Sequence, residues 1–236
     1  MNIIGKLIIA IVILVILYTL YQWYFSGSSS TTIITGPIAA ENATQKNLGH
    51  SVGNIGSAHY SYSVWIYIKD WSYRFGEPKI LFSRKDGNGR VGPQLVLGGD
   101  QNTVTAMVSD NQNNVTQCQV TQVPIQTWVN IIVVLNQQAL DIYIDGKLTR
   151  TCVLSGVPGL DRDSGLWVCP GIGQSNERGF DGYLASFRAF PYPLNPRQAY
   201  EVYREGHEGV SVSLFNKYRL KLGFYKGNRE MGSFEI

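Results

Sequence analysis

An uninterrupted apolar run occupies the start of the chain. From Leu7 to Phe25, nineteen consecutive residues carry no charge, and aromatic residues gather at the C-terminal end of the run. A helix of this length would span roughly 28 Å, close to the ~30 Å of a hydrocarbon core, and the rings suit the headgroup region. The pattern predicts a transmembrane helix over 7–25. A cleaved signal peptide is the alternative, but its apolar region is usually shorter.

Charge around this run predicts its orientation. Lys6 and the α-amino group precede it, and positively charged flanks tend to stay in the cytoplasm. We therefore expect a single-pass membrane protein with the short segment 1–6 on the cytoplasmic side and the rest on the opposite side. Residues 26–47 are small, polar and nearly uncharged, which is typical of a linker.

From about residue 48, short apolar runs are separated by turn residues. In "YSYSVWIYI", residues 60–68, every second residue from Tyr60 onward falls on one face, while Trp65 and Tyr67 fall on the other. Such runs predict an all-β domain over 48–210, folded as two packed antiparallel sheets. The candidate strands are 60–68, 79–83, 93–98, 103–109, 115–121, 128–135, 140–144, 147–154, 166–172 and 182–190.

One helix is expected within this β pattern. In "PLNPRQAYEVYREG", residues 193–206, Asn195 is a good N-cap, Pro196 suits the first helical position, and Gly206 can end the helix. The segment 211–236 alternates again around Tyr218 to Phe224, which indicates either a strand that closes the sandwich or a docking arm.

Composition argues against a nucleic-acid-binding protein and against a scaffold with several disulfides. The net charge of +3 is small and dispersed, so no basic face for nucleic acid is indicated. Three cysteines permit at most one disulfide. We expect Cys118 and Cys152 to lie close in space, because their strands should run side by side; a bridge and two buried thiols both stay open.

The order of these elements resembles the laminin-G-like jelly roll of the concanavalin A-like lectin/glucanase superfamily, over about 60–206. In that family a tryptophan opens a central strand, a Tyr-x-Asp-Gly hairpin follows, and a strand ending in arginine leads into a short helix. The residues in those places are Trp128, Tyr143, Asp145, Gly146, Phe180, Gly182, Leu184, Phe187, Arg188 and Tyr203. The resemblance implies the fold alone, because this fold carries lectins, adhesion modules, hydrolases and structural domains.

The stretch "ALDIYIDGKL", residues 139–148, raises the question of catalysis, because Asp141 and Asp145 are four residues apart. Asp145-Gly146 is typical of a type I′ hairpin turn, and in that register Asp141 should face Arg150. The glucanases of the superfamily need two glutamates on one strand; aligned on Asp141, that pattern places Ala139 where the nucleophile should be. We therefore expect no enzymatic activity, with a glycoside hydrolase as the unfavoured alternative.

Two loops are candidates for a calcium site, which many members of this family contain. "DRDSG" supplies Asp161 and Asp163, and "KDGNG" supplies Asp86 and Asn88. Neither completes a standard calcium loop, so plain turns are the competing interpretation. Asp161 and Asp163 are the preferred calcium ligands if a site exists.

Binding of a glycan or a protein partner is predicted at the loop that contains Trp71, Tyr73, Arg74 and Phe75, where aromatic and cationic side chains cluster. Asn42 and Asn114 lie in Asn-x-Ser/Thr acceptors for N-glycosylation.

The sequence therefore predicts a non-enzymatic, membrane-anchored recognition or structural module with a protein or glycan partner. An anchor, a linker and one small jelly-roll-like domain also look like a membrane-linked minor capsid protein of a large DNA virus, with a capsid or envelope component as partner and the virion membrane as its location. A cell-surface carbohydrate-binding lectin is the alternative.

Overall fold

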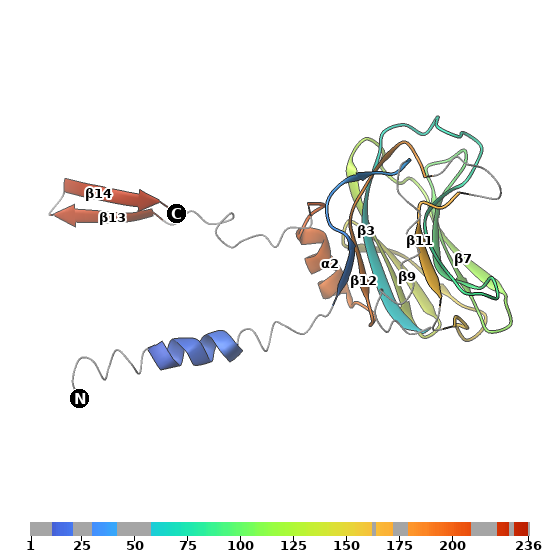
Figure 1. Ribbon diagram of the computed structural model, residues 1–236, viewed down its shortest axis with the longest axis horizontal. Helices are drawn as coiled ribbons and strands as arrows, with labels where there is room; N and C mark the ends of the chain where they lie inside the picture. The colour runs from blue at the N-terminus through green and yellow to red at the C-terminus, as the bar shows by residue number, and fades with distance from the viewer. Residues whose placement is uncertain are drawn as a thin grey trace.

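The computed structural model describes residues 11–20, 30–41, 58–161, 164–171, 179–208, 221–226 and 229–235. Two antiparallel sheets face each other and form the sandwich in Figure 1. The larger sheet has the order β1-β12-β3-β8-β9-β10, with β2 also on β12, and the smaller has the order β11-β4-β5-β6-β7. The expected all-β sandwich with one short helix is confirmed.

The strands of the larger sheet are β1 (Thr31–Ile34), β2 (Ile38–Ala39), β3 (His59–Ile68), β8 (Trp128–Asn136), β9 (Ala139–Ile144), β10 (Lys147–Val153) and β12 (Gly182–Phe190). Those of the smaller sheet are β4 (Lys79–Lys85), β5 (Val91–Leu97), β6 (Val104–Ser109), β7 (Val115–Val120) and β11 (Gly165–Val168).

The main core lies between the sheets. Every second residue of β3, from Tyr60 to Ile68, is buried there, as the alternation predicts. Tyr62 contacts Phe82 of the opposite sheet, with ring centroids 5.4 Å apart. Each fully buried side chain of this size contributes roughly 1.5–3 kcal/mol of hydrophobic free energy, so this layer holds the two sheets together.

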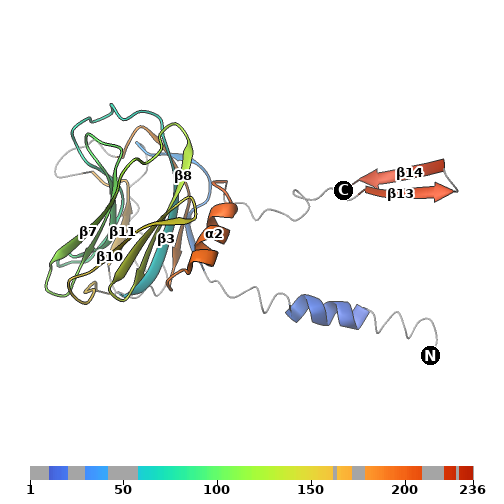
Figure 2. The same cartoon turned by 180° about the vertical axis from the view of Figure 1, so that it is seen from behind.

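The outer face of the larger sheet is partly covered by α2 (Pro196–Arg204), which Figure 2 shows beside β3 and β8. Asn195 and Gln198 cap the helix reciprocally, with the Asn195 side chain accepting from the Gln198 backbone N–H. Ala199 and Val202 pack in a second apolar cluster that includes Ile132, Val134, Tyr143, Phe190 and Leu194. The predicted N-cap and first-turn proline are both confirmed.

A disulfide joins the two sheets at one edge of the sandwich. Cys118 of β7 and Cys152 of β10 are bonded, and their Cα atoms are 5.8 Å apart. Of the two arrangements that the sequence left open, the structure contains the bridge. Cys169 is a buried free thiol, and burial raises its pKa above the ordinary thiol value.

Part of the predicted linker is strand. Within 26–47, β1 and β2 pair antiparallel with β12. The β-branched run Thr31 to Ile34 suits a strand, and the pairing satisfies backbone groups that β12 would otherwise leave open. The sandwich therefore begins earlier in the chain than the composition indicates.

The two terminal predictions fall partly outside the described residues. Residues 11–20 are helical, and their large apolar side chains are half or more exposed, whereas both ends of the predicted span 7–25 lie outside the described part. Within that part, no helix has both the length and the apolarity needed to cross a membrane. At the C-terminus, β13 (Lys221–Lys226) pairs with β14 (Arg229–Glu235) in a two-stranded sheet, rather than with the sandwich.

Candidate functional site

Three loops meet at one end of the sandwich, which we call the loop end: 69–78 after β3, 98–103 after β5 and 121–127 after β7. Backbone hydrogen bonds join them, from Gly76 N–H to the Gly99 carbonyl (3.0 Å) and from Val123 N–H to the Asn102 carbonyl (2.9 Å). A Cβ at Gly99 would lie 2.6 Å from the Gly76 carbonyl. Glycine at 99 therefore permits this close approach of two loops.

Three aromatic rings lie side by side on the outer face of the larger sheet, where it reaches the loop end. Tyr67 pairs with Trp128 on β8 and with Tyr183 on β12. Because paired residues of adjacent strands point to the same face, all three rings emerge together. Tyr67 is 5.6 Å from Trp128 and 6.3 Å from Tyr183, between ring centroids. We call Tyr67, Trp128 and Tyr183 the aromatic platform.

The platform is half-buried and partly open. With Pro37 it lines a shallow hollow of about 200 Å³. On one side His207 stacks on Trp128, with centroids 4.5 Å apart and planes 14° apart. On the other side the Lys69 Nζ lies 4.5 Å from the centre of the Tyr183 ring and 3.6 Å from the Asp181 carboxylate. The platform is therefore an apolar, ring-lined surface with one charge pair at its edge.

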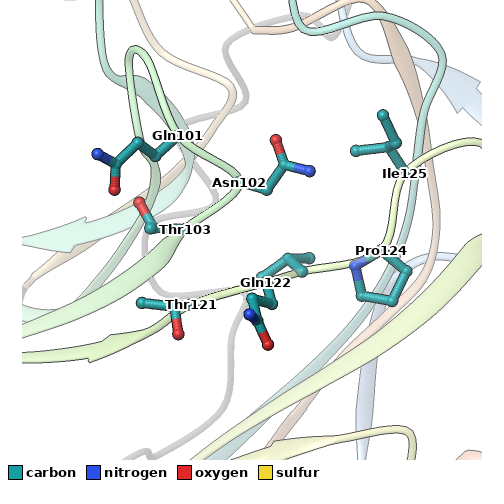
Figure 3. Close-up of a pocket in the computed structure, with 8 residues that line it drawn as sticks. Gln101, Asn102, Thr103, Thr121, Gln122, Pro124 and Ile125 are labelled. Atoms are coloured by element: carbon teal, nitrogen blue, oxygen red, sulfur yellow. The ribbon is translucent and has the colours of Figure 1, made fainter.

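A polar hollow of about 540 Å³ lies between the second and third loops of the loop end (Figure 3). Uncharged residues line it: Gln101, Asn102, Thr103, Thr121, Gln122, Val123, Pro124 and Ile125. Gln122 and Gln126 hold left-handed backbone conformations, with φ of 60° and 57°. Such conformations are costly away from glycine, and they cluster at binding sites.

The predicted binding cluster at 71–75 does not form one exposed surface. Trp71 packs against the main core, with the Lys79 ammonium 5.6 Å from its ring centre. The Arg74 side chain is only 4% exposed and pairs with Glu77 at 2.9 Å. Tyr73 is half-buried, whereas Phe75 is 67% exposed. The loop turns these neighbouring side chains to different environments, which a linear cluster does not reveal.

The two candidate calcium loops lie next to each other, but an arginine links their carboxylates. Arg90 donates from Nε to Asp86 and from Nη2 to Asp161, both at 2.8 Å, and Asn88 donates to Asp161 at 3.0 Å. Within the described part of the chain, no three acidic, His or Cys side chains group as metal ligands. Asp163 lies outside that part. The guanidinium therefore binds both carboxylates in the arrangement observed and offsets one of their two negative charges.

Asp86 is the buried centre of this network. Burial alone would raise the pKa of its carboxyl, but hydrogen bonds from the backbone N–H groups of Arg90 and Asp161, and from the Arg90 guanidinium, outweigh it and hold the pKa below the usual range.

The hairpin that carries Asp141 has the expected turn but a different register. Asp145 and Gly146 have φ of 49° and 72°, as a type I′ turn requires. The pairing shifts between Leu148 and Arg150, so Asp141 faces Thr151 and not the expected Arg150. The Thr151 hydroxyl donates to the Asp141 carboxylate at 2.6 Å. The predicted pairing is therefore wrong by one residue, because the irregularity inserts an extra residue in β10.

Of the two glycosylation acceptors, the structure describes Asn114 alone. Asn114 is exposed just before β7, and its side-chain amide donates to the Asp110 carboxylate at 2.9 Å. Asn42 lies outside the described residues.

The sequence analysis did not predict the platform as a binding site, although the alternation of 60–68 already places Tyr67 on the outer face.

Comparisons with known proteins agree with this fold. Residues 41–199 match the family model Laminin_G_3, described as the concanavalin A-like lectin/glucanases superfamily. Among solved structures, the binding domain of botulinum neurotoxin serotype G superposes with a TM-score of 0.57 and 14% identity, covering 76% of this chain and 47% of the toxin chain. No curated protein matches the chain.

Two further toxin structures give the same result. The binding domain of botulinum neurotoxin DC, in complex with rat synaptotagmin II, has a TM-score of 0.56 and 13% identity, covering 77% of this chain and 48% of that one. A botulinum neurotoxin type C structure, whose description concerns cell entry through two ganglioside molecules, has a TM-score of 0.53 and 15% identity over 77% and 48%. The chain thus spans about half the length of these structures, and the likeness concerns the fold. The protein belongs to the concanavalin A-like lectin/glucanase superfamily.

Proposed function

We propose that this protein is a membrane-anchored, non-enzymatic recognition module that binds a glycan on the aromatic platform. The observation that carries the proposal is the placement of Tyr67, Trp128 and Tyr183 on three adjacent strands, with their rings half-exposed at the loop end. Sugar rings present an apolar C–H face that packs on aromatic rings, while tyrosine hydroxyl and indole N–H groups bond to sugar hydroxyls. The platform offers both kinds of contact.

The carboxylates support binding rather than hydrolysis. A retaining glycosidase needs two carboxyl groups about 5–5.5 Å apart across the scissile bond. The Asp181 carboxylate beside the platform is held by Lys69, and Asp141 is held by Thr151. Neither arrangement supplies the acid and nucleophile pair that the reaction requires.

Related folds supply examples of both partner classes. The toxin structures that superpose on this chain are described with ganglioside molecules in one case and with synaptotagmin II in another. These descriptions concern the toxins, and they support a glycan or a protein as the class of partner for this fold.

The test measures glycan binding by the full-length chain in lipid nanodiscs. A glycan array would identify a ligand, and calorimetry would compare Tyr67→Ala and Tyr183→Ala with the wild type. Each variant should lose about tenfold or more in affinity, because each ring buries apolar area worth roughly 1.5 kcal/mol or more. Phe75→Ala is the matched control and should bind normally. Loss of binding in Phe75→Ala alone, or turnover of a β-glucan, would contradict the proposal.

Anchoring is the second part of the proposal. The described helical residues 11–20 are apolar on every face and exposed, and such a helix needs an apolar surrounding. The disulfide suits an oxidising compartment across the membrane from the cytoplasm. Alkaline extraction of membranes should leave the full chain in the pellet, and deletion of 1–29 should release it. Recovery of both forms in the soluble fraction would contradict anchoring.

A protein partner is the second candidate, and the free edge of the larger sheet favours it. Among the strands that the structure describes, β10 pairs with β9 alone, and Leu148 and Val153 are 51% and 71% exposed. Exposed apolar edges add strands or segments from partners. A capsid or envelope component would fit this edge, and Val153→Lys should then abolish co-purification with a virus particle or cell envelope while leaving glycan binding intact.

A further inference from the structure

Residues 121–125 of the third loop line the polar hollow, and the platform residue Trp128 directly follows the end of that loop. The last lining residue of the hollow on this loop, Ile125, lies three residues before Trp128, a stretch of chain that spans at most about 10 Å. Gln126 N–H donates to the Ile68 carbonyl at 2.8 Å, directly beside Tyr67. One loop therefore links the hollow to two of the three platform strands.

The lining of the hollow matches the chemistry of sugar hydroxyls. Its polar side chains are two glutamines, an asparagine and two threonines, beside the apolar Pro124 and Ile125. Amides and hydroxyls both donate and accept hydrogen bonds, as sugar hydroxyls do. Carboxylate, sulfate or phosphate groups are instead recognised by Arg or Lys, and none of the described residues that line the hollow is charged. The chemistry therefore favours an uncharged, hydroxyl-rich ligand.

The backbone of the hollow is held in place without using these side chains. Val123 N–H donates to the backbone carbonyl of Asn102, and Gly98 N–H donates to the backbone carbonyl of Thr103, both at 2.9 Å. A Cβ at Gly98 would lie 2.3 Å from the Thr103 hydroxyl, so glycine allows this tight turn. A site that is ordered before binding loses less entropy when the ligand arrives.

Within the proposed glycan function, we propose that the hollow is a second subsite, and that hollow and platform together bind a neutral oligosaccharide of several residues rather than a single or acidic sugar. One end of the oligosaccharide stacks on the platform, and the next residues reach the amides of the hollow. This proposal rests on the proposed function and adds the charge and the length of the ligand.

The experiment compares ligands of graded length on the full-length chain in nanodiscs. The probes are neutral gluco-, manno- and galacto-oligosaccharides from disaccharide to hexasaccharide, their methyl monosaccharides, and uronic acid oligomers of the same lengths. Wild-type affinity should rise with the length of a neutral series, and the acidic oligomers should bind more weakly.

The variants separate the two subsites. Gln122→Ala should lower affinity for the long neutral oligosaccharide by about tenfold and leave the methyl monosaccharide unaffected, whereas Tyr67→Ala should weaken both. Gln122→Gly keeps the left-handed backbone accessible and should reproduce the loss, which excludes misfolding as the cause. Gln117→Ala, on an exposed position of β7, is the matched control.

Each result bears on one proposal or both. Unchanged length dependence in Gln122→Ala, with a loss in Tyr67→Ala, would overturn the second subsite and leave the platform function standing. Stronger binding of the acidic oligomers would overturn the neutral ligand class. Absence of binding to every probe on a broad glycan array would overturn both the subsite and the glycan function.

Discussion

At the scale of single residues, Asp141 shows how local hydrogen bonding replaces an apparent catalytic role. Its carboxylate accepts from the Thr151 hydroxyl across the β9–β10 ladder. We expect Asp141→Ala to lower the free energy of unfolding by about 0.2–1 kcal/mol and to leave glycan binding unchanged. Urea denaturation measures the first and calorimetry the second. Arg150→Ala, which removes the side chain that the unshifted register would pair with Asp141, should leave stability nearly unchanged.

Asp86 predicts how stability responds to acid. Because its pKa is lowered in the folded state, its contribution is present above the unfolded pKa of about 3.9 and is lost as the pH falls through the folded pKa. Asp86→Asn should therefore flatten the loss of stability between about pH 5 and pH 2. At neutral pH it should cost roughly 2 kcal/mol or more, because Arg90 loses its buried partner.

The measurement is urea denaturation across that pH range, on both proteins. Asp100→Asn, at an exposed loop position, is the matched control and should follow the wild-type curve. A variant curve parallel to the wild-type curve would show that Asp86 does not set the acid response.

At the scale of elements, α2 depends on its cap. Asn195→Ala removes the side chain that accepts from the Gln198 N–H, so the free energy of unfolding should fall by about 1 kcal/mol. Arg197→Ala, which removes an exposed side chain paired with the exposed Glu201, should cost far less. Tyr203 lies in α2 and stacks on Trp65, and His207, shortly after the helix, stacks on Trp128. Near-ultraviolet circular dichroism should therefore report the loosened helix.

The disulfide gives a second prediction for elements. It closes a loop of 34 residues between β7 and β10, so replacing both cysteines by alanine should lower the free energy of unfolding by roughly 2–4 kcal/mol. Cys169→Ala, which removes a buried free thiol, should have a smaller effect. Equal losses in the two variants would mean that packing, and not the cross-link, dominates.

Local patterns predicted the elements well and their contacts less well. Alternation located β3, and the Asp145-Gly146 turn located the β9–β10 hairpin, because both depend on neighbouring residues. The shift before Arg150 was missed because a bulge depends on packing beyond the hairpin. Asp86 and Asp161 are 75 positions apart, and the platform joins three strands distant in sequence. Those contacts follow from sheet order, which no local pattern contains.

At the scale of the whole molecule, the edges of the sandwich are held differently. The β7 and β10 edge carries the covalent bridge, whereas β1 and β2 hold the other side of the larger sheet by short pairings with β12. Backbone amides of β1 and β2 should therefore exchange hydrogen faster than those of β9 next to the bridge. Hydrogen-exchange mass spectrometry measures this, and equal protection at both edges would contradict it.

Formation of the disulfide also marks a step in folding, the docking of the two sheets. Cys118 and Cys152 belong to different sheets, and docking of the sheets holds the two thiols together, so we expect their oxidation to accompany docking. A newly made chain that is denatured and alkylated at successive times should pass from three blocked thiols to one, Cys169, in step with closure of the sandwich. The number of alkylated thiols per chain thus reports how far the sandwich has assembled, and a shift in gel mobility measures it in living cells.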